Sequence, residues 1–382
     1  MSWIIPENKL DDQQRHFYEN VDINSRNMWI RGFPGSGKSV LLAYTLKKIK
    51  KNNPNARVAV VVFTRSLITM FKAAFAEMGI SANIMTFYEF MDSGKSYDYI
   101  LCDEVQDLVP SVLRAMNSRA SHVIVAGDEN QSIFESDPRY RESTVIPSQI
   151  KSMLDANDYE LSIIHRLSSS IISAVQRFLP GLNVFTAKRD LAKQSTQIRL
   201  CSASTCQQEA SYVYNEAKKA VNVGQTAGIL LPAHDNIVVF VNEILSAEHK
   251  PIWTPVTNNW GKIDYAAMNS HLYSNGILIQ YVGNGYGSFS EDSRRITLMT
   301  YHSSKGLDFD NVFLPSLDNS LFISRNEHMS KILFMVAMTR SRNNLYLTYC
   351  GRRHSYLNNF ASDCNNISIG SNPTNGGNVF GF

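Results

Sequence analysis

The stretch Gly32-Phe33-Pro34-Gly35-Ser36-Gly37-Lys38-Ser39 fits the pattern G-x-x-x-x-G-K-[ST]. It lies between an apolar run at 27–31, which reads as a strand, and a stretch at 38–50 with helical spacing. Gly35 and Gly37 let the backbone wrap a phosphate with its N–H groups pointing inward, and the start of the helix adds a positive partial charge. We therefore expect Lys38 to contact the β- and γ-phosphates of a nucleotide and Ser39 to bind Mg²⁺.

Two adjacent carboxylates, Asp103 and Glu104, follow a second apolar run at 97–101. An acidic pair alone is usually a solvated turn, but here it stands at the carboxyl end of a predicted strand. Asp103 is expected to hold Mg²⁺, directly or through water, and Glu104 to orient and deprotonate the attacking water.

Short apolar runs alternate with helical stretches along the chain, which predicts an α/β fold with parallel sheets. We place a domain boundary near residue 160, giving domains at 1–160 and 161–360 and a flexible tail at 361–382 that is rich in Asn, Gly and Ser. The runs that read as strands are 27–31, 57–63, 84–87, 97–103, 122–126, 228–231, 277–281, 296–299, 312–314 and 345–349.

The composition excludes several classes of protein. The 382 residues are 44% hydrophobic and carry a net charge of +3, which excludes a disordered chain and a histone-like polycation. A nucleic-acid partner would have to be bound through local patches. No apolar run approaches the ~20 residues that cross a bilayer, and no signal peptide is evident. The five cysteines form no C-x-x-C pair, and we expect them to be reduced in a cytoplasmic protein: Cys102, Cys201, Cys206, Cys350 and Cys364.

The first half of the chain resembles the superfamily 1 helicases of the UvrD/Rep type. Residues 103–107 (D-E-V-Q-D) resemble their D-E-x-Q-D signature, residues 10–14 their Q motif, and residues 127–134 (G-D-E-N-Q-S-I-F) their G-D-x-x-Q-S-I-Y motif. The resemblance implies a P-loop NTPase with two RecA-like domains. It makes Gln14 the reader of adenine and Gln131 the γ-phosphate sensor. It also makes the following residues contacts for nucleic acid: Phe63, Thr64, Arg65, Thr86, Phe87 and Phe134.

The second predicted domain, 161–360, carries the remaining motifs in order. His165-Arg166 resembles the family's Y-R pair, residues 300–309 (T-Y-H-S-S-K-G-L-D-F) resemble T-x-H-x-x-K-G-L-E-F, and residues 336–341 resemble V-A-x-T-R-A. The resemblance implies that Arg166 and Arg340 reach the γ-phosphate of ATP when the domains close, as arginine fingers do. It assigns nucleotide contacts to His165, Gly306 and Asp308, and nucleic-acid contacts to Thr300 and His302.

The chain also departs from the family. Only twelve residues separate Phe90 from Asp103, and the stretch 166–300 is modest, so we expect the large accessory insertions of bigger relatives to be absent. Ser136 stands near the place of an aromatic that stacks on a base. Trp260 and Tyr286 have no motif context, and we expect residues of this kind to lie in the core or at its rim.

These observations predict an ATP- and Mg²⁺-dependent motor on single-stranded nucleic acid, with DNA favoured and 3′-to-5′ polarity implied by the resemblance alone. The alternative is a nucleotide-dependent switch subunit that acts with a partner such as a nuclease and does not unwind by itself. A small-molecule kinase with the same loop predicts none of the second-half motifs. No membrane partner is expected.

Overall fold

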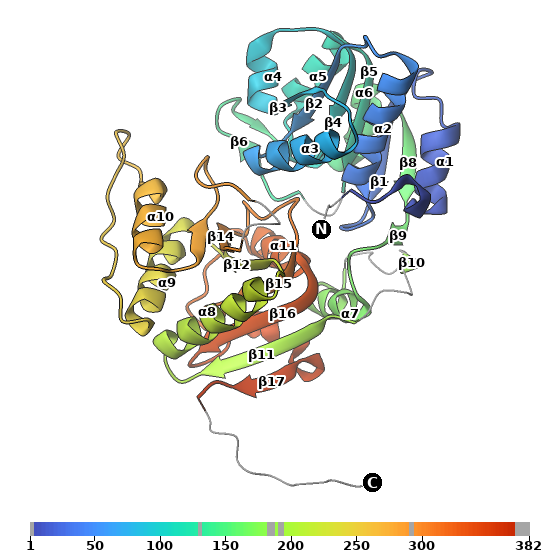
Figure 1. The fold of residues 1–382 in the computed structure, drawn as a ribbon. Coiled ribbons are helices and arrows are strands. Elements are labelled where there is room, and N and C mark those ends of the chain that lie inside the picture. The colour runs from blue at the N-terminus through green and yellow to red at the C-terminus, as the bar shows by residue number, and fades with distance from the viewer. Residues whose placement is uncertain (1–3, 129–131, 182–187, 190–194, 290–293, 371–382) are drawn as a thin grey trace.

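Two parallel β-sheets, one in each half of the chain, organise the protein (Figure 1). The computed structural model describes residues 4–128, 132–181, 188–189, 195–289 and 294–370. We call the part built on the first sheet the first domain and the part built on the second sheet the second domain. The predicted α/β class with parallel sheets is confirmed.

The first sheet has the strand order β3-β2-β4-β5-β1-β8, and its neighbours pair in parallel. All five residues of β2 are buried because both faces are covered. Val58, Val60 and Val62 pack with α2 and α3 on one face, while Ala59 and Val61 pack with α4 and α5 on the other. The elements are α1 (Asp12–Asn20), β1 (Asn27–Gly32), α2 (Lys38–Asn52), β2 (Val58–Val62), α3 (Arg65–Glu77), β3 (Asn83–Thr86), α4 (Phe87–Ser93), β4 (Tyr97–Cys102), α5 (Pro110–Arg119), β5 (Ala120–Gly127), α6 (Pro147–Leu154) and β8 (Ala156–Leu161).

The second sheet has the order β13-β14-β12-β15-β16-β11-β17, again with parallel neighbours. One face packs against α7 and α11 and the other against α8, α9 and α10. The elements are α7 (Ser169–Phe178), β11 (Gln197–Ala203), α8 (Cys206–Asn222), β12 (Ala227–Leu231), α9 (His234–Ala247), α10 (Tyr265–Ser274), β13 (Ile279–Tyr281), β14 (Ile296–Thr300), β15 (Phe309–Leu314), α11 (Glu327–Met338), β16 (Ser341–Cys350) and β17 (Asn365–Ser368).

Two short strand pairs lie outside the main sheets. β6 (Ser136–Asp137) and β7 (Glu142–Ser143) pair antiparallel, and β9 (Ile163–Ile164) pairs in parallel with β10 (Lys188–Arg189). Within the described residues, no helix is long and apolar enough to cross a membrane.

Two expectations from the sequence are wrong. Residues 361–370 are not a flexible tail, because residues 365–368 form β17 and extend the second sheet beside β11, and the rest of the predicted tail lies outside the described residues. The cysteines are not all reduced: Cys206 and Cys350 form a disulfide with a Cα–Cα distance of 5.3 Å. The parallel pairing of β11 with β16 places Ala203 opposite Cys350, so the helix that follows β11 starts beside the end of β16.

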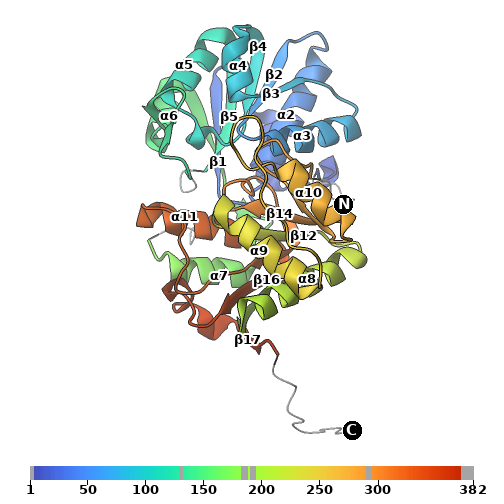
Figure 2. The same cartoon turned by 90° about the vertical axis from the view of Figure 1, so that its left-hand side faces the viewer.

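The two domains meet at the carboxyl ends of the strands of the first sheet (Figures 1 and 2). Loops that follow β1 and β4 contact residues of the second half here. His165 N donates to Gly35 O at 2.9 Å, and the Lys305 ammonium reaches Asp107. Ligands of open α/β sheets bind at this edge, so this is the place to look for a site.

Candidate functional site

The Gly-rich loop after β1 forms a turn that ends in the first turn of α2. Gly35 and Gly37 have φ of 76° and 84°, a left-handed region that side chains with a Cβ rarely adopt. Lys38 is buried, and its ammonium donates to Gly32 O at 2.7 Å and to Phe33 O at 3.0 Å. Burial lowers the pKa of Lys38, whereas the nearby carboxylates of Asp128 and Glu104 raise it. The Lys38 side chain therefore folds back onto the Gly-rich loop, where it was predicted to contact phosphates.

Residues from distant parts of the chain contact this loop closely. A Cβ on Gly35 would lie 2.4 Å from Arg166 Cβ, and one on Gly37 would lie 2.3 Å from Gln14 Nε2. The Gln14 amide donates to Ser36 O at 3.1 Å and accepts from Asp11 N at 3.2 Å. In this structure the side-chain amide of Gln14, which was predicted to bind adenine, is bonded to the loop and to Asp11. The contact of Gln14 with adenine stays a prediction.

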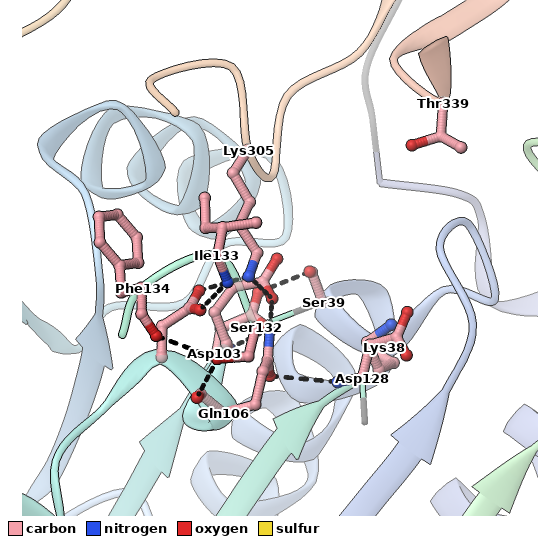
Figure 3. A network of polar contacts seen from close by, with 12 residues as sticks. Lys38, Ser39, Asp103, Gln106, Asp128, Ser132, Ile133, Phe134, Lys305 and Thr339 are labelled. Carbon is pink, nitrogen blue, oxygen red and sulfur yellow. Dashed lines mark hydrogen bonds and ion pairs between the residues drawn. The ribbon is translucent and has the colours of Figure 1, made fainter. Parts of the chain in front are cut away.

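An oxygen pair suited to Mg²⁺ lies beside the loop (Figure 3). The Ser39 hydroxyl donates to Asp103 Oδ2 at 2.6 Å, and Asp103 is buried at the end of β4. Burial, together with the charge of Glu104, raises the pKa of Asp103 to about 6. No cluster of three His, Cys, Asp or Glu side chains that could hold a metal occurs among the described residues. The pair fits Mg²⁺ all the same, because this ion is usually held by one or two protein oxygens together with substrate phosphates and water.

Glu104 has a backbone conformation that is unusual for a side chain of its size. Its φ is 55°, directly after the strand. Its carboxylate accepts from Gln106 Nε2 at 2.6 Å and lies 3.5 Å from the Lys305 ammonium. Burial raises the pKa of Glu104, but Lys305 and Lys38 outweigh burial and the pKa falls below its ordinary value. Glu104 is therefore ionised at neutral pH, as a proton acceptor must be.

Lys305 is a residue of this site that was not singled out from the sequence, although it lies within the motif at 300–309. Lys305 extends from the second domain toward the polar network of the first (Figure 3). Its ammonium pairs there with Asp107 and Glu104. All three side chains are largely buried, with 4%, 0% and 13% exposure. Burial lowers the pKa of Lys305, but the carboxylates of Asp107 and Glu104 raise it by more than burial lowers it. The pKa therefore lies above its ordinary value, and the charged form is favoured.

Gln106 is a second residue that was missed. Its side chain joins the ends of two neighbouring strands, because its amide donates to Glu104 and its Oε1 accepts from Asp128 N at 3.1 Å. The Q at the fourth position of the D-E-x-Q-D signature was the available signal. Gln131, the predicted γ-phosphate sensor, lies outside the described residues.

Arg166 and Arg340, both from the part of the chain after residue 160, lie on the side of the site opposite the Gly-rich loop and β4. Arg340 is fully buried and donates to Val336 O at 2.8 Å, Leu307 O at 3.2 Å and Thr339 Oγ1 at 3.1 Å. Burial, and then the neighbouring Arg166, lower the pKa of Arg340 to about 9, which leaves it charged at neutral pH. Arg340 and Lys38 both interact with the charges of Glu104, Asp128 and Arg166, so the two side chains belong to one electrostatic cluster.

The other predicted nucleotide contacts lie around this cluster. Asp308 pairs with Arg342 and lies 3.8 Å from Arg166, and its pKa is lowered by these arginines despite burial. His165 Nε2 lies 2.6 Å from Asp11 Oδ2, and the His165 backbone N–H donates to Gly35 of the Gly-rich loop. Gly306, with φ of 82°, packs against Leu67 of α3. Their contacts with ribose and adenine stay predictions.

The aromatic residues among those predicted to contact nucleic acid, Phe63, Phe87 and Phe134, form one aromatic cluster with His302 of the second domain. Phe63 stacks on Phe87 and Phe134 with ring centroids 5.2 and 4.5 Å apart, and Phe134 meets His302 at 5.6 Å. Burial lowers the pKa of His302, with further contributions from His234 and Lys305. The partly buried rings of Phe63, Phe134 and His302 therefore lie together, and the buried ring of Phe87 packs against Phe63.

The predicted threonines have local structural roles in addition. Thr64 and Thr86 are the N-caps of α3 and α4, and Thr300 Oγ1 accepts from Ser303 N at 3.2 Å. Arg65 is exposed beside Gly285 of the second domain, where an added Cβ would lie 3.3 Å from its Nη1. These roles fix the segments. Thr86 and Thr300 are buried, with 8% and 3% exposure, and their contacts with nucleic acid stay predictions.

Comparisons with known proteins agree with this geometry. Residues 277–352 match the UvrD-like helicase C-terminal domain, and residues 14–137 match an AAA domain. The chain is 38% identical over 68 residues to the ATP-dependent DNA helicase Rep of Buchnera aphidicola subsp. Schizaphis graminum, covering 16% of this chain and 10% of that protein. It is 42% identical over 62 residues to the RecBCD enzyme subunit RecB of Chlamydia pneumoniae, covering 16% and 6%.

A longer match is to the F-box DNA helicase protein 1 of Schizosaccharomyces pombe, 23% identical over 348 residues, which covers 74% of this chain and 37% of that protein. The chain thus spans well under two thirds of the length of each of these relatives. The two family matches fall on the two parallel sheets and include the Gly-rich loop, the D-E-x-Q-D stretch and the motifs at 300–309 and 336–341. The chain therefore belongs to the UvrD-like helicases of superfamily 1.

Proposed function

We propose that the chain is an ATP-dependent translocase or helicase on single-stranded DNA, which hydrolyses ATP between its two domains. The observation that carries this proposal is the buried contact of Lys305 with Glu104 and Asp107. It joins a turn of the second domain to the carboxylate that would act as general base in the first. The 3′-to-5′ direction rests on the family resemblance.

Each charged residue of the cluster has a separate task in this proposal. Ser39 and Asp103 would hold Mg²⁺, which when bound supplies positive charge to the phosphates. Glu104 would take the proton of the attacking water, since it is ionised at neutral pH. The Lys38 ammonium, which donates to the carbonyls of Gly32 and Phe33 in this structure, would donate to the phosphates of bound ATP instead. Arg166 and Arg340 would supply positive charge from the other side of the cleft.

Nucleic acid would act on this site through one short turn. His302 belongs to the aromatic cluster, and Lys305, whose backbone N–H donates to His302 O at 3.3 Å, belongs to the charged cluster. A strand that shifts His302 therefore shifts Lys305 relative to Glu104. Such a coupling between strand binding and domain closure would make hydrolysis depend on DNA.

A second candidate is a switch subunit that closes on ATP but does not separate strands by itself. It is favoured by the short connections within both domains. Only α4 lies between β3 and β4, and only residues 282–295 lie between β13 and β14. No room is left in these connections for a domain that grips duplex. The relative RecB is named as a subunit of a larger enzyme, which suggests a partner such as a nuclease.

The test is the ATPase rate titrated with single-stranded DNA, single-stranded RNA and duplex at one stated salt concentration. We expect stimulation by single strands that is abolished in Lys38→Ala and Glu104→Gln. Glu327→Gln, an exposed carboxylate paired with Lys331, is the matched control. An ATPase that responds to none of the three nucleic acids would overturn the motor proposal. A forked duplex then separates the candidates, since ATPase without unwinding or strand movement supports the switch.

A further inference from the structure

The segment between α9 and α10 carries an exposed tryptophan that no motif explains. Trp260 is 81% exposed, whereas the other described tryptophans, Trp29 and Trp253, are 3% and 5% exposed. An indole is one of the most costly side chains to leave in water, and exposed aromatic groups commonly mark binding sites. In both views this segment rises from the second domain to the level of the first (Figures 1 and 2).

The tip that carries Trp260 is an ordered hairpin. Thr257 and Ile263 form an antiparallel bridge, and Asn258 N donates to Lys262 O at 2.8 Å. The Asn258 side chain accepts from Trp260 N at 2.9 Å and from Lys262 N at 3.1 Å. The indole is therefore presented on a fixed turn, with the ammonium of the exposed Lys262 on the same turn.

The hairpin is joined to the surface where nucleic acid is expected. Asn258 Nδ2 donates to the Tyr286 hydroxyl at 3.1 Å, and Tyr286 closes a turn with Gly283 through a pair of backbone hydrogen bonds. Gly285 in that turn lies against the Arg65 guanidinium of the first domain. Arg65 follows Phe63 and Thr64, which begin the aromatic cluster.

A second line of aromatic contacts leads to the same hairpin. His302 of the aromatic cluster lies near His234, whose charge contributes to lowering the pKa of His302. His234 Nδ1 lies 3.3 Å from the hydroxyls of Tyr265 and Tyr281, and Tyr265 meets Tyr286 edge to face at 5.8 Å. Tyr265 and Tyr281 are buried, with 4% and 0% exposure, so these contacts fix the base of the hairpin relative to His302 through the core of the second domain.

We propose that Trp260 is a stacking site for a base of single-stranded nucleic acid, and that Lys262 neutralises a phosphate beside it. The proposal rests on the proposed function, which brings the strand to the Phe63–His302 surface. It also accounts for the missing aromatic near Ser136, because a platform in the second domain replaces one lost from the first. Stacking on an indole is tolerant of sequence, since every base has a π-face.

The test compares Trp260→Ala and Trp260→Phe with the wild type in anisotropy titrations of labelled oligo(dT) of increasing length. We expect Trp260→Ala to bind long strands about tenfold more weakly and the shortest strands equally well, because only long strands reach the hairpin. Trp260→Phe keeps a ring and should bind within a few-fold of the wild type, but should lose quenching of tryptophan fluorescence by the strand. Tyr273→Ala removes an aromatic that is 67% exposed at the other end of α10 and is the control.

Lys262→Ala provides an independent measurement. It should reduce the slope of log affinity against log salt by about 0.7, the value for one phosphate contact on a single strand. Equal affinity of Trp260→Ala and wild type for the longest strand would overturn this inference alone, and would leave the exposed indole to a protein ligand. A wild type that binds no strand at all would overturn the proposed function as well.

Discussion

The buried contact between Lys305 and the carboxylates of Asp107 and Glu104 gives the sharpest prediction. Lys305→Met keeps the length and apolar stem of the side chain but leaves two buried carboxylates without their cation. Removing one partner of a buried ion pair costs about 3–5 kcal/mol. Because Lys305 belongs to the second domain and both carboxylates to the first, this cost falls on the closed arrangement of the domains and not on the core of either.

A cost of 3 kcal/mol corresponds to a factor of about 150 in the population of the closed arrangement. We therefore expect Lys305→Met to lower the DNA-stimulated ATPase rate at least about 100-fold and to increase the radius of gyration in small-angle scattering. The cores should still unfold cooperatively in urea. Lys331→Met breaks an exposed pair with Glu327 and should change the rate by less than about threefold.

A double variant tests the origin of the effect. In Asp107→Asn the amide oxygen can still accept from Ile133 N, a bond of 3.1 Å in this structure. Combined with Lys305→Met, it removes both charges, so the double variant should recover part of the compact scattering lost by the single one. A Lys305→Met protein that is as compact and as active as the wild type would refute the role given to this contact.

Three further predictions concern other parts of the molecule. Arg340→Lys should lower the turnover of ATP about 10³-fold, because an ammonium cannot replace the guanidinium fork, and an unchanged kcat would exclude a role for Arg340 in hydrolysis. Phe134→Ala should raise the DNA concentration that half-stimulates the ATPase by about tenfold while leaving the rate without DNA unchanged. Burial raises the pKa of Glu209, so its carboxyl contributes stability below about pH 4.5 that is lost as pH rises. Glu209→Gln keeps an oxygen for Ser316 N and Thr348 Oγ1, so urea unfolding should show it gaining stability relative to wild type between about pH 4 and pH 7, and a constant difference would contradict this.

The strands and helices that were predicted from the sequence are those with strong local patterns. β2 was recognised because it consists of five consecutive β-branched or small apolar residues, which favour a buried strand. α2 was recognised because its helical spacing continues over a long stretch. β8 and β17 were missed because their residues are mostly polar, and only pairing with β1 and β11 makes them strands. The disulfide was missed for a similar reason, since its cysteines are 144 residues apart.

The sequence by itself determined the parallel α/β fold and the Gly-rich loop, because hydrophobic periodicity and the left-handed glycines act within a few residues. Only the tertiary structure decided which side chains meet. Lys305 reaches Asp107 across 198 residues, Arg166 covers Gly35, and the hairpin of Trp260 is fixed through Tyr286 to a turn beside Arg65. These contacts depend on how segments far apart in the chain pack against each other, and no local pattern of residues records that arrangement.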